Sequence, residues 1–110
     1  METDIRLIAL DLDGTFLRDD RSIPEKNAEA VRAAVRSGVD ICLASGRVIG
    51  SIRPFCDLIG FRGPIVSCNG AFIADKTGRE IHHSALPVGV RDIVVRYVRE
   101  NRLHLNVYCR

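Results

Sequence analysis

Two aspartates lie two residues apart in the segment 11–15, Asp-Leu-Asp-Gly-Thr, directly after the apolar run 7–10. Two carboxylates this close repel each other and lose hydration when they are buried, unless a cation holds them. A hard divalent cation such as Mg²⁺ takes oxygen ligands and few protein carboxylates, with phosphate and water completing its shell. The spacing therefore predicts that Asp11 and Asp13 hold Mg²⁺, although aspartates are also common as caps in strand-end loops.

A second polar segment, Ser45-Gly46-Arg47, follows the apolar run 39–44. Ser45 offers a hydroxyl group, which could also cap the helix that we expect to start here. Gly46 lets a backbone N–H approach a small anion at that helix start. Arg47 has two equally weighted interpretations, contact with a substrate or a structural ion pair. Phosphoryl transfer is the chemistry that suits this set of groups: Mg²⁺, two carboxylates, a hydroxyl and exposed backbone N–H groups.

The elements around these segments alternate between strand and helix. Residues 5–10, 39–45 and 63–68 read as buried strands. Ser22 and Pro24 predict a helix start, with Ser22 as the N-cap, and Gly38 ends that helix. This order predicts an α/β fold of Rossmann-like type, a parallel sheet with helices on both faces and right-handed crossovers. Because ligands bind at the carboxyl ends of such strands, the two polar segments should face one crevice.

The later part of the chain predicts a change of architecture. Asn69-Gly70 favours a hairpin turn, the segment 75–78 a second turn, and 79–83 a partner strand. A third amphipathic helix follows Pro87, and 103–109 alternates as a half-exposed antiparallel strand would. We expect that helix to turn its apolar residues inward: Val90, Ile93, Val94, Tyr97 and Val98. A domain boundary near 85–87 divides the chain into 1–85 and 86–110.

Length and composition exclude several classes of protein. The 110 residues, 46% hydrophobic and 27% charged, suit one small domain or part of a larger one. A formal net charge of +2 gives no reason to expect nucleic acid or a membrane surface as partner. No apolar run approaches the ~18 residues of a membrane span, and the N-terminus lacks a signal-peptide pattern. The four cysteines read as free structural residues, which predicts a reducing cytoplasm.

These motifs resemble those of a known family. Asp-x-Asp-Gly-Thr after a first strand resembles the opening motif of the haloacid dehalogenase superfamily, and 43–47, LASGR, resembles its second motif. The Ser-Ile-Pro helix start between them and the segment 66–73, VSCNGAFI, are similar to the Cof-type sugar-phosphatase branch. The segment from 79 onward resembles the opening of its type IIB cap. The resemblance implies a phosphatase acting on small phosphorylated metabolites such as sugar phosphates.

The resemblance also implies roles for the two aspartates. Asp11 would be the nucleophile that forms an aspartyl-phosphate, and it would also bind Mg²⁺. Asp13 would bind Mg²⁺ through its backbone carbonyl, while its side chain protonates the leaving oxygen and later activates water. Because an acid must hold a proton, we expect a nearby anion and partial burial to raise the pKa of Asp13.

The same resemblance assigns the phosphate and substrate contacts. The backbone N–H groups of Leu12 and Gly46 and the hydroxyl of Ser45 would bind phosphoryl oxygens. Arg47 would contact the substrate or the cap.

Two parts of the family pattern are missing. The family has a later lysine that binds phosphate and an acidic motif that completes the Mg²⁺ site, whereas the only lysine after residue 47 is Lys76, in the 75–78 turn. We therefore expect an N-terminal piece of the enzyme that is a poor phosphatase alone. The family's first strand is central, so 5–10 should have an uncovered edge that favours self-association.

Two other functions stay open at the level of sequence. A receiver-like phospho-acceptor module also clusters acids after its first strand, but it needs an aspartate after its third strand. The residues there are Ser67, Cys68 and Asn69. The other alternative is a non-catalytic remnant that only binds or associates.

Overall fold

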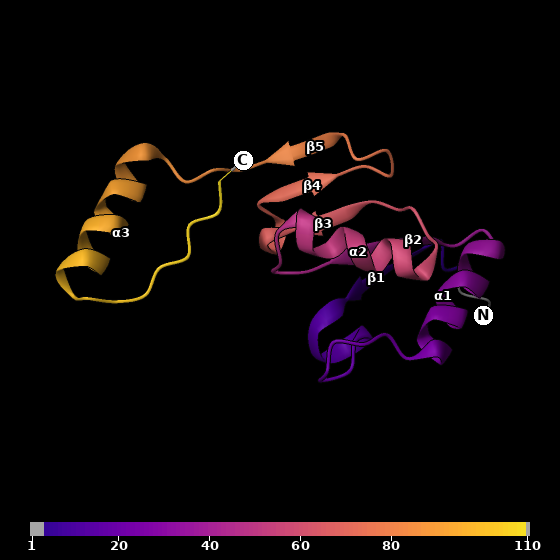
Figure 1. Ribbon diagram of the computed structural model, residues 1–110. Helices are drawn as coiled ribbons and strands as arrows, with labels where there is room; N and C mark the ends of the chain where they lie inside the picture. Colours follow the sequence, from indigo (N-terminus) through magenta and orange to yellow (C-terminus); the bar gives the residue numbers. More distant parts are fainter. Residues whose placement is uncertain (1–3, 110) are drawn as a thin grey trace.

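The protein is described here by a computed structural model of residues 4–109, which has the expected α/β architecture (Figure 1). Five strands form one sheet in the order β1-β2-β3-β4-β5. Strands β1 to β3 run parallel, and β4 and β5 add to them antiparallel. Their bounds are Leu7–Asp11, Asp40–Ala44, Ile65–Ser67, Phe72–Ala74 and Glu80–His83. The parallel strands bring the carboxyl ends of β1 and β2 to the same edge of the sheet.

The register of β1 on β2 places the two polar segments side by side. Asp11, the last residue of β1, pairs with Ala44, the last residue of β2. The segments 12–15 and 45–48 therefore leave the sheet at the same level. Among the described residues β1 pairs with β2 alone and lies at the end of the sheet order, as the expected uncovered edge requires.

Two helices, α1 at Glu25–Arg36 and α2 at Ile49–Ile59, connect the parallel strands, pack on the sheet and contact each other. Each buries an apolar stripe, which removes hydrocarbon from water and stabilises the fold. All four cysteines are free, as expected, and two of them are buried. The core cluster consists of Leu12, Phe16, Leu17, Val31, Ile41, Leu43, Ile52, Cys56, Ile59, Phe61 and Ile65.

Both helices begin later than the sequence predicts. Ser22 does not cap α1, because its hydroxyl donates to the Asp20 carboxylate at 2.6 Å and the helix starts after Pro24. Helix α2 starts at Ile49, because Val48 has extended backbone (φ −68°, ψ 150°). Gly46 therefore lies in a loop that precedes the helix.

The expected hairpin turns are present. The first joins β3 to β4 through Cys68–Gly70, where Asn69 and Gly70 adopt positive φ values of 53° and 94°. Asparagine and glycine tolerate this left-handed backbone better than other residues do. In the second turn the Asp75 carboxylate accepts hydrogen bonds from the Thr77 N–H at 2.8 Å and the Thr77 hydroxyl at 2.6 Å.

The third helix, α3 at Val88–Glu100, differs from the prediction in its surroundings. It stands apart from the sheet (Figure 1), and no residue of it is buried. The expected inward face is therefore wrong for the described residues: Ile93 is 66% exposed and Tyr97 is 60% exposed. Residues 103–109 form no strand, because they have no partner strand among the described residues. The proposed division at 85–87 falls in the connection between β5 and α3 and stays a prediction.

No helix in the described range combines the length and the apolar character that crossing a membrane requires.

Candidate active site

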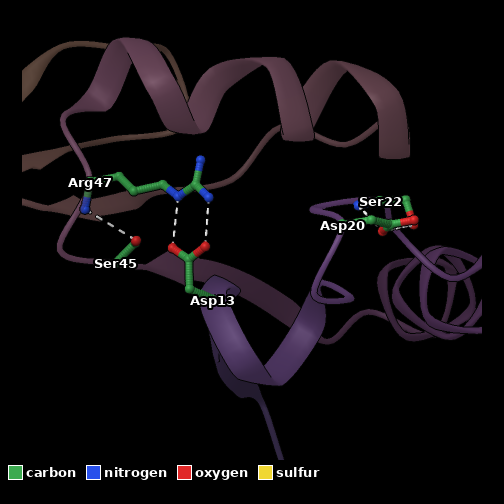
Figure 2. Close-up of polar contacts among 5 residues, drawn as sticks. All are labelled: Asp13, Asp20, Ser22, Ser45 and Arg47. Carbon is green, nitrogen blue, oxygen red and sulfur yellow. Dashed lines mark hydrogen bonds and ion pairs between the residues drawn. The ribbon is translucent and has the colours of Figure 1, made fainter.

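The two polar segments meet through a bidentate ion pair between Arg47 and Asp13 (Figure 2). Arg47 Nε donates to one carboxylate oxygen of Asp13 at 2.7 Å, and Nη2 donates to the other at 2.5 Å. Paired N–H donors that match both carboxylate oxygens make the strongest form of this contact. Of the two interpretations of Arg47, the structure therefore has the ion pair.

The ion pair reverses the expected pKa shift of Asp13. The hydrogen bonds from Arg47 are the main cause that lowers the pKa of this carboxyl below its ordinary value of 3.8, against a smaller raising effect of burial. The expectation of a raised pKa is wrong here because the nearest charged group is a cation and the Asp13 side chain is 55% exposed. Asp13 is held in its ionised form.

Arg47 is fixed along its whole length. Its backbone N–H donates to Ser45 Oγ at 3.2 Å, and its carbonyl accepts from the Cys68 N–H at 2.9 Å. Its guanidinium lies over the ring of Phe55, with Cζ 5.2 Å from the ring centroid. Ser45 and the hairpin thus hold the backbone of Arg47, and Asp13 and helix α2 hold its guanidinium. No motif in the sequence indicated that Phe55, a residue of α2, borders this site.

Ser45 and Gly46 lie against the turn that follows β3. Ser45 is buried, its N–H donates to the Val66 carbonyl at 2.9 Å, and its carbonyl accepts from the Asn69 N–H at 3.2 Å. A Cβ on Gly46 would lie 3.0 Å from Oδ1 of Asn69, so any side chain at position 46 requires Asn69 to shift. Asn69, expected only to form a turn, therefore also borders the site.

Asp11 and Leu12 reach the site in different ways. The Asp11 side chain is exposed at the end of β1 and makes no hydrogen bond or ion pair within residues 4–109. Leu12 sends its side chain into the core, where it is fully buried, and this anchors the backbone between the two aspartates. Gly14, with φ of 74°, then lets the chain bend back, and the Leu17 N–H donates to the Leu12 carbonyl at 2.9 Å.

The donor atoms in this loop fit a hard cation in kind. Asp11 offers carboxylate oxygens, and the backbone carbonyl of Asp13 offers one more oxygen, whereas the Asp13 side chain is bound by Arg47. Within the described residues no cluster of three or more His, Cys, Asp and Glu side chains is placed to hold a metal ion. Further oxygen ligands, from phosphate, water or additional polypeptide, would have to complete the coordination shell of the metal ion.

Comparison with known proteins identifies the family. The family model described as haloacid dehalogenase-like hydrolase matches residues 8–110. This chain belongs to that family. Its member from Bacillus subtilis, the 5-amino-6-(5-phospho-D-ribitylamino)uracil phosphatase YitU, is 38% identical over 94 residues, which cover 82% of this chain and 34% of the relative. The pyridoxal phosphate phosphatase YbhA of Escherichia coli is 28% identical and matches 94% of this chain and 38% of its own length.

Solved structures of haloacid dehalogenase-like hydrolases have the same fold as this chain. One from B. subtilis superimposes with a TM-score of 0.82 at 28% identity, over 89% of this chain and 34% of that one. Another from Bacteroides thetaiotaomicron gives 0.80 at 30% identity, over 89% and 38%. This chain thus spans about a third of the length of the relatives that it matches.

Proposed function

We propose that this hydrolase-family chain provides the nucleophile loop of a Mg²⁺-dependent phosphatase that cleaves monoesters of small phosphorylated metabolites. The observation that carries the proposal is the Arg47–Asp13 ion pair, because it joins the loops after β1 and β2 at one edge of the sheet. The names of the relatives, phosphatases of a ribitylaminouracil phosphate and of pyridoxal phosphate, support this class of substrate.

In the first proposed step, a carboxylate oxygen of Asp11 attacks the phosphorus atom and the bond to the ester oxygen breaks. The exposed and unpaired Asp11 side chain is suited to this attack. Asp13 donates a proton to the departing oxygen, so an alcohol leaves and an aspartyl-phosphate remains. Because Arg47 holds Asp13 ionised, this donation requires the Arg47 contact to loosen and the Asp13 carboxylate to take up a proton from solvent before the ester bond breaks.

In the second proposed step, Asp13 takes a proton from water, and the water oxygen attacks the phosphorus atom. Inorganic phosphate leaves, and the Asp11 carboxylate is restored. The ionised state in which Arg47 holds Asp13 is the state that this base step needs. Backbone N–H groups of Leu12 and Gly46 and the Ser45 hydroxyl would bind the phosphoryl oxygens.

Asp11 and the Asp13 carbonyl would hold Mg²⁺, which supplies positive charge to neutralise the phosphoryl group. The relatives reported above are phosphatases, and none of them supports the receiver-like alternative.

The test is hydrolysis of p-nitrophenyl phosphate with Mg²⁺ by the longest natural form of this chain. We expect Asp11→Asn to retain less than about a tenth of the parent activity, since an amide cannot act as the nucleophile. The matched control is Asp57→Asn, an exposed carboxylate in α2, which should keep full activity. Activity of Asp11→Asn above that tenth would contradict the assignment, and a long-lived adduct with acetyl phosphate would favour a receiver.

A further inference from the structure

The aromatic ring beneath the Arg47 guanidinium has no part in the proposed chemistry. Phe55 lies in α2, half-buried against the core, and its ring centroid is 5.2 Å from Arg47 Cζ. A guanidinium within about 6 Å of a ring face is attracted by the negative charge of that face. The contact therefore connects a core helix to the loop that carries the ion pair.

The ring and the carboxylate together define where the guanidinium lies. The carboxylate of Asp13 binds Nε and Nη2, while the ring of Phe55 supports the guanidinium plane. A free arginine side chain has many rotamers, and fixing one of them costs conformational entropy. A rigid ring attached to a packed helix reduces this cost, because it restricts the guanidinium before the carboxylate binds it.

We propose that Phe55 is a positioning residue of this site, whose ring holds the Arg47 guanidinium at the height where its N–H groups meet Asp13. The ring touches neither reacting atoms nor substrate, and it acts through Arg47. With the ring removed, Arg47 keeps its backbone anchors to Ser45 and Cys68, but its guanidinium leaves Asp13 more often.

The consequence for phosphoryl transfer rests on the function proposed above. Only Nε and Nη2 of Arg47 donate to Asp13, and within residues 4–109 Nη1 has no hydrogen-bond partner. A guanidinium that stays on the ring keeps its Nη1 donors fixed, so they are available to a phosphoryl or leaving-group oxygen when a substrate arrives. Phe55 would then position a donor for the substrate as well as one for the acid.

The competing explanation is that Phe55 only fills space, because it also packs against the core cluster. Replacement of Phe55 by leucine changes the core packing and also removes the ring. This variant alone therefore cannot distinguish a packing role from the contact with Arg47. Fluorination of the ring separates them, since each fluorine withdraws charge from the ring face and changes the ring volume little. The experiment therefore places phenylalanine and its mono-, di- and trifluorinated forms at position 55 of this chain.

The measured quantity is the exchange rate of the Arg47 Nε–H proton with water by NMR, with the signal assigned by its loss in Arg47→Lys. We expect the rate to rise stepwise with fluorination, by about two- to fivefold at three fluorines, which corresponds to the usual strength of such a contact. The melting temperature should stay constant along the series. Phe55→Tyr should keep the slow exchange, and Phe55→Leu should lose it.

The matched control applies the same fluorinated series to Phe72, a half-buried phenylalanine of β4 whose ring meets His83 at 5.9 Å. That series should leave Arg47 unchanged. A constant rate across the Phe55 series, or an equal rise in the Phe72 series, would overturn the proposal. Neither readout requires turnover, so such a failure leaves the proposed phosphatase intact, and failure of the Asp11 test leaves the ring contact intact.

Discussion

Helices α2 and α3 have comparable amphipathic sequences and opposite surroundings. Helix α2 buries Ile52, Cys56 and Ile59 and sends Phe55 to the candidate active site. Helix α3 carries valines, one isoleucine and a tyrosine at similar spacing, yet none of its residues is buried. A periodic pattern therefore identifies which face of a helix is apolar, whereas the surface that covers this face depends on other chain segments.

The two helices also differ in how they are attached to the rest of the molecule. Helix α2 lies between two parallel strands, so the sheet fixes both of its ends. Helix α3 follows the last strand and has no described strand after it. The first arrangement can transmit a precise position to the site, as the contact of Phe55 with Arg47 shows.

The two helices should differ most in how much each contributes to stability. Ile52→Ala, at a fully buried position of α2, should lower the free energy of unfolding by about 2–5 kcal/mol, the cost of an emptied core site. Ile93→Ala, at a position of α3 that is 66% exposed, should change it by less than about 0.5 kcal/mol. Urea denaturation of both variants measures the difference. A similar cost at both positions would mean that α3 is covered in solution.

A smaller effect concerns association, since both ends of the molecule expose apolar groups. We propose that copies of this chain pair through the edge of β1 that has no partner strand among residues 4–109, because it offers backbone hydrogen bonds that a helix lacks. Leu7→Lys, at a position that is 57% exposed, should weaken self-association about tenfold, as edge charges do. Light scattering over a concentration series measures it. Tyr97→Lys on α3 is the control, and dissociation caused by that variant alone would place the contact on α3.

The smallest effect is the pH dependence of the ionised groups in the sheet region. Arg47 lowers the pKa of Asp13, and hydrogen bonds from Thr77 and Arg79 lower the pKa of Asp75 to about 2. Because both folded pKa values lie below 3.8, these carboxylates stabilise the fold above that pH, and the contribution is lost as the pH falls through the folded values. The Asp13 side chain is 55% exposed, so solvent screens its ion pair and keeps that contribution small.

NMR titration of the side-chain carboxyl carbons tests this. Arg47→Gln should move the Asp13 midpoint up toward 3.8 and leave the Asp75 midpoint unchanged. An Asp13 midpoint above 3.8 in the parent chain would mean that the ion pair does not persist in solution.

The order of elements and the edge of the sheet that carries the site follow from local sequence signals. Apolar runs, glycines and turn residues such as Asn69-Gly70 determine the local backbone conformation of a few neighbouring residues, so the strands and turns that they form can be inferred from sequence. The meeting of Asp13 and Arg47 at one edge follows too, because parallel strands align their carboxyl ends.

What could not be inferred depends on contacts between distant segments. The direction of the Asp13 pKa shift is set by the rotamer of Arg47, which in turn depends on the position of Phe55. The Ser22 hydroxyl donates to the Asp20 carboxylate and so does not cap α1, and the sequence alone gives no reason to prefer one of these partners. The exposure of α3 depends on which other segments pack against it, and the sequence of residues 88–100 carries no information about those segments.

The close approach of Gly46 to the Asn69 side chain has an evolutionary consequence. Since a Cβ at position 46 would meet Oδ1 of Asn69 at 3.0 Å, a side chain at position 46 requires the Asn69 side chain to shift, and we expect the two positions to change together. A lineage that first acquires a smaller residue at 69 opens position 46 to alanine or serine, whereas the reverse order passes through a crowded intermediate. Mutational history at these two sites should therefore be directional, with changes at 69 preceding changes at 46 along the branches of the family tree.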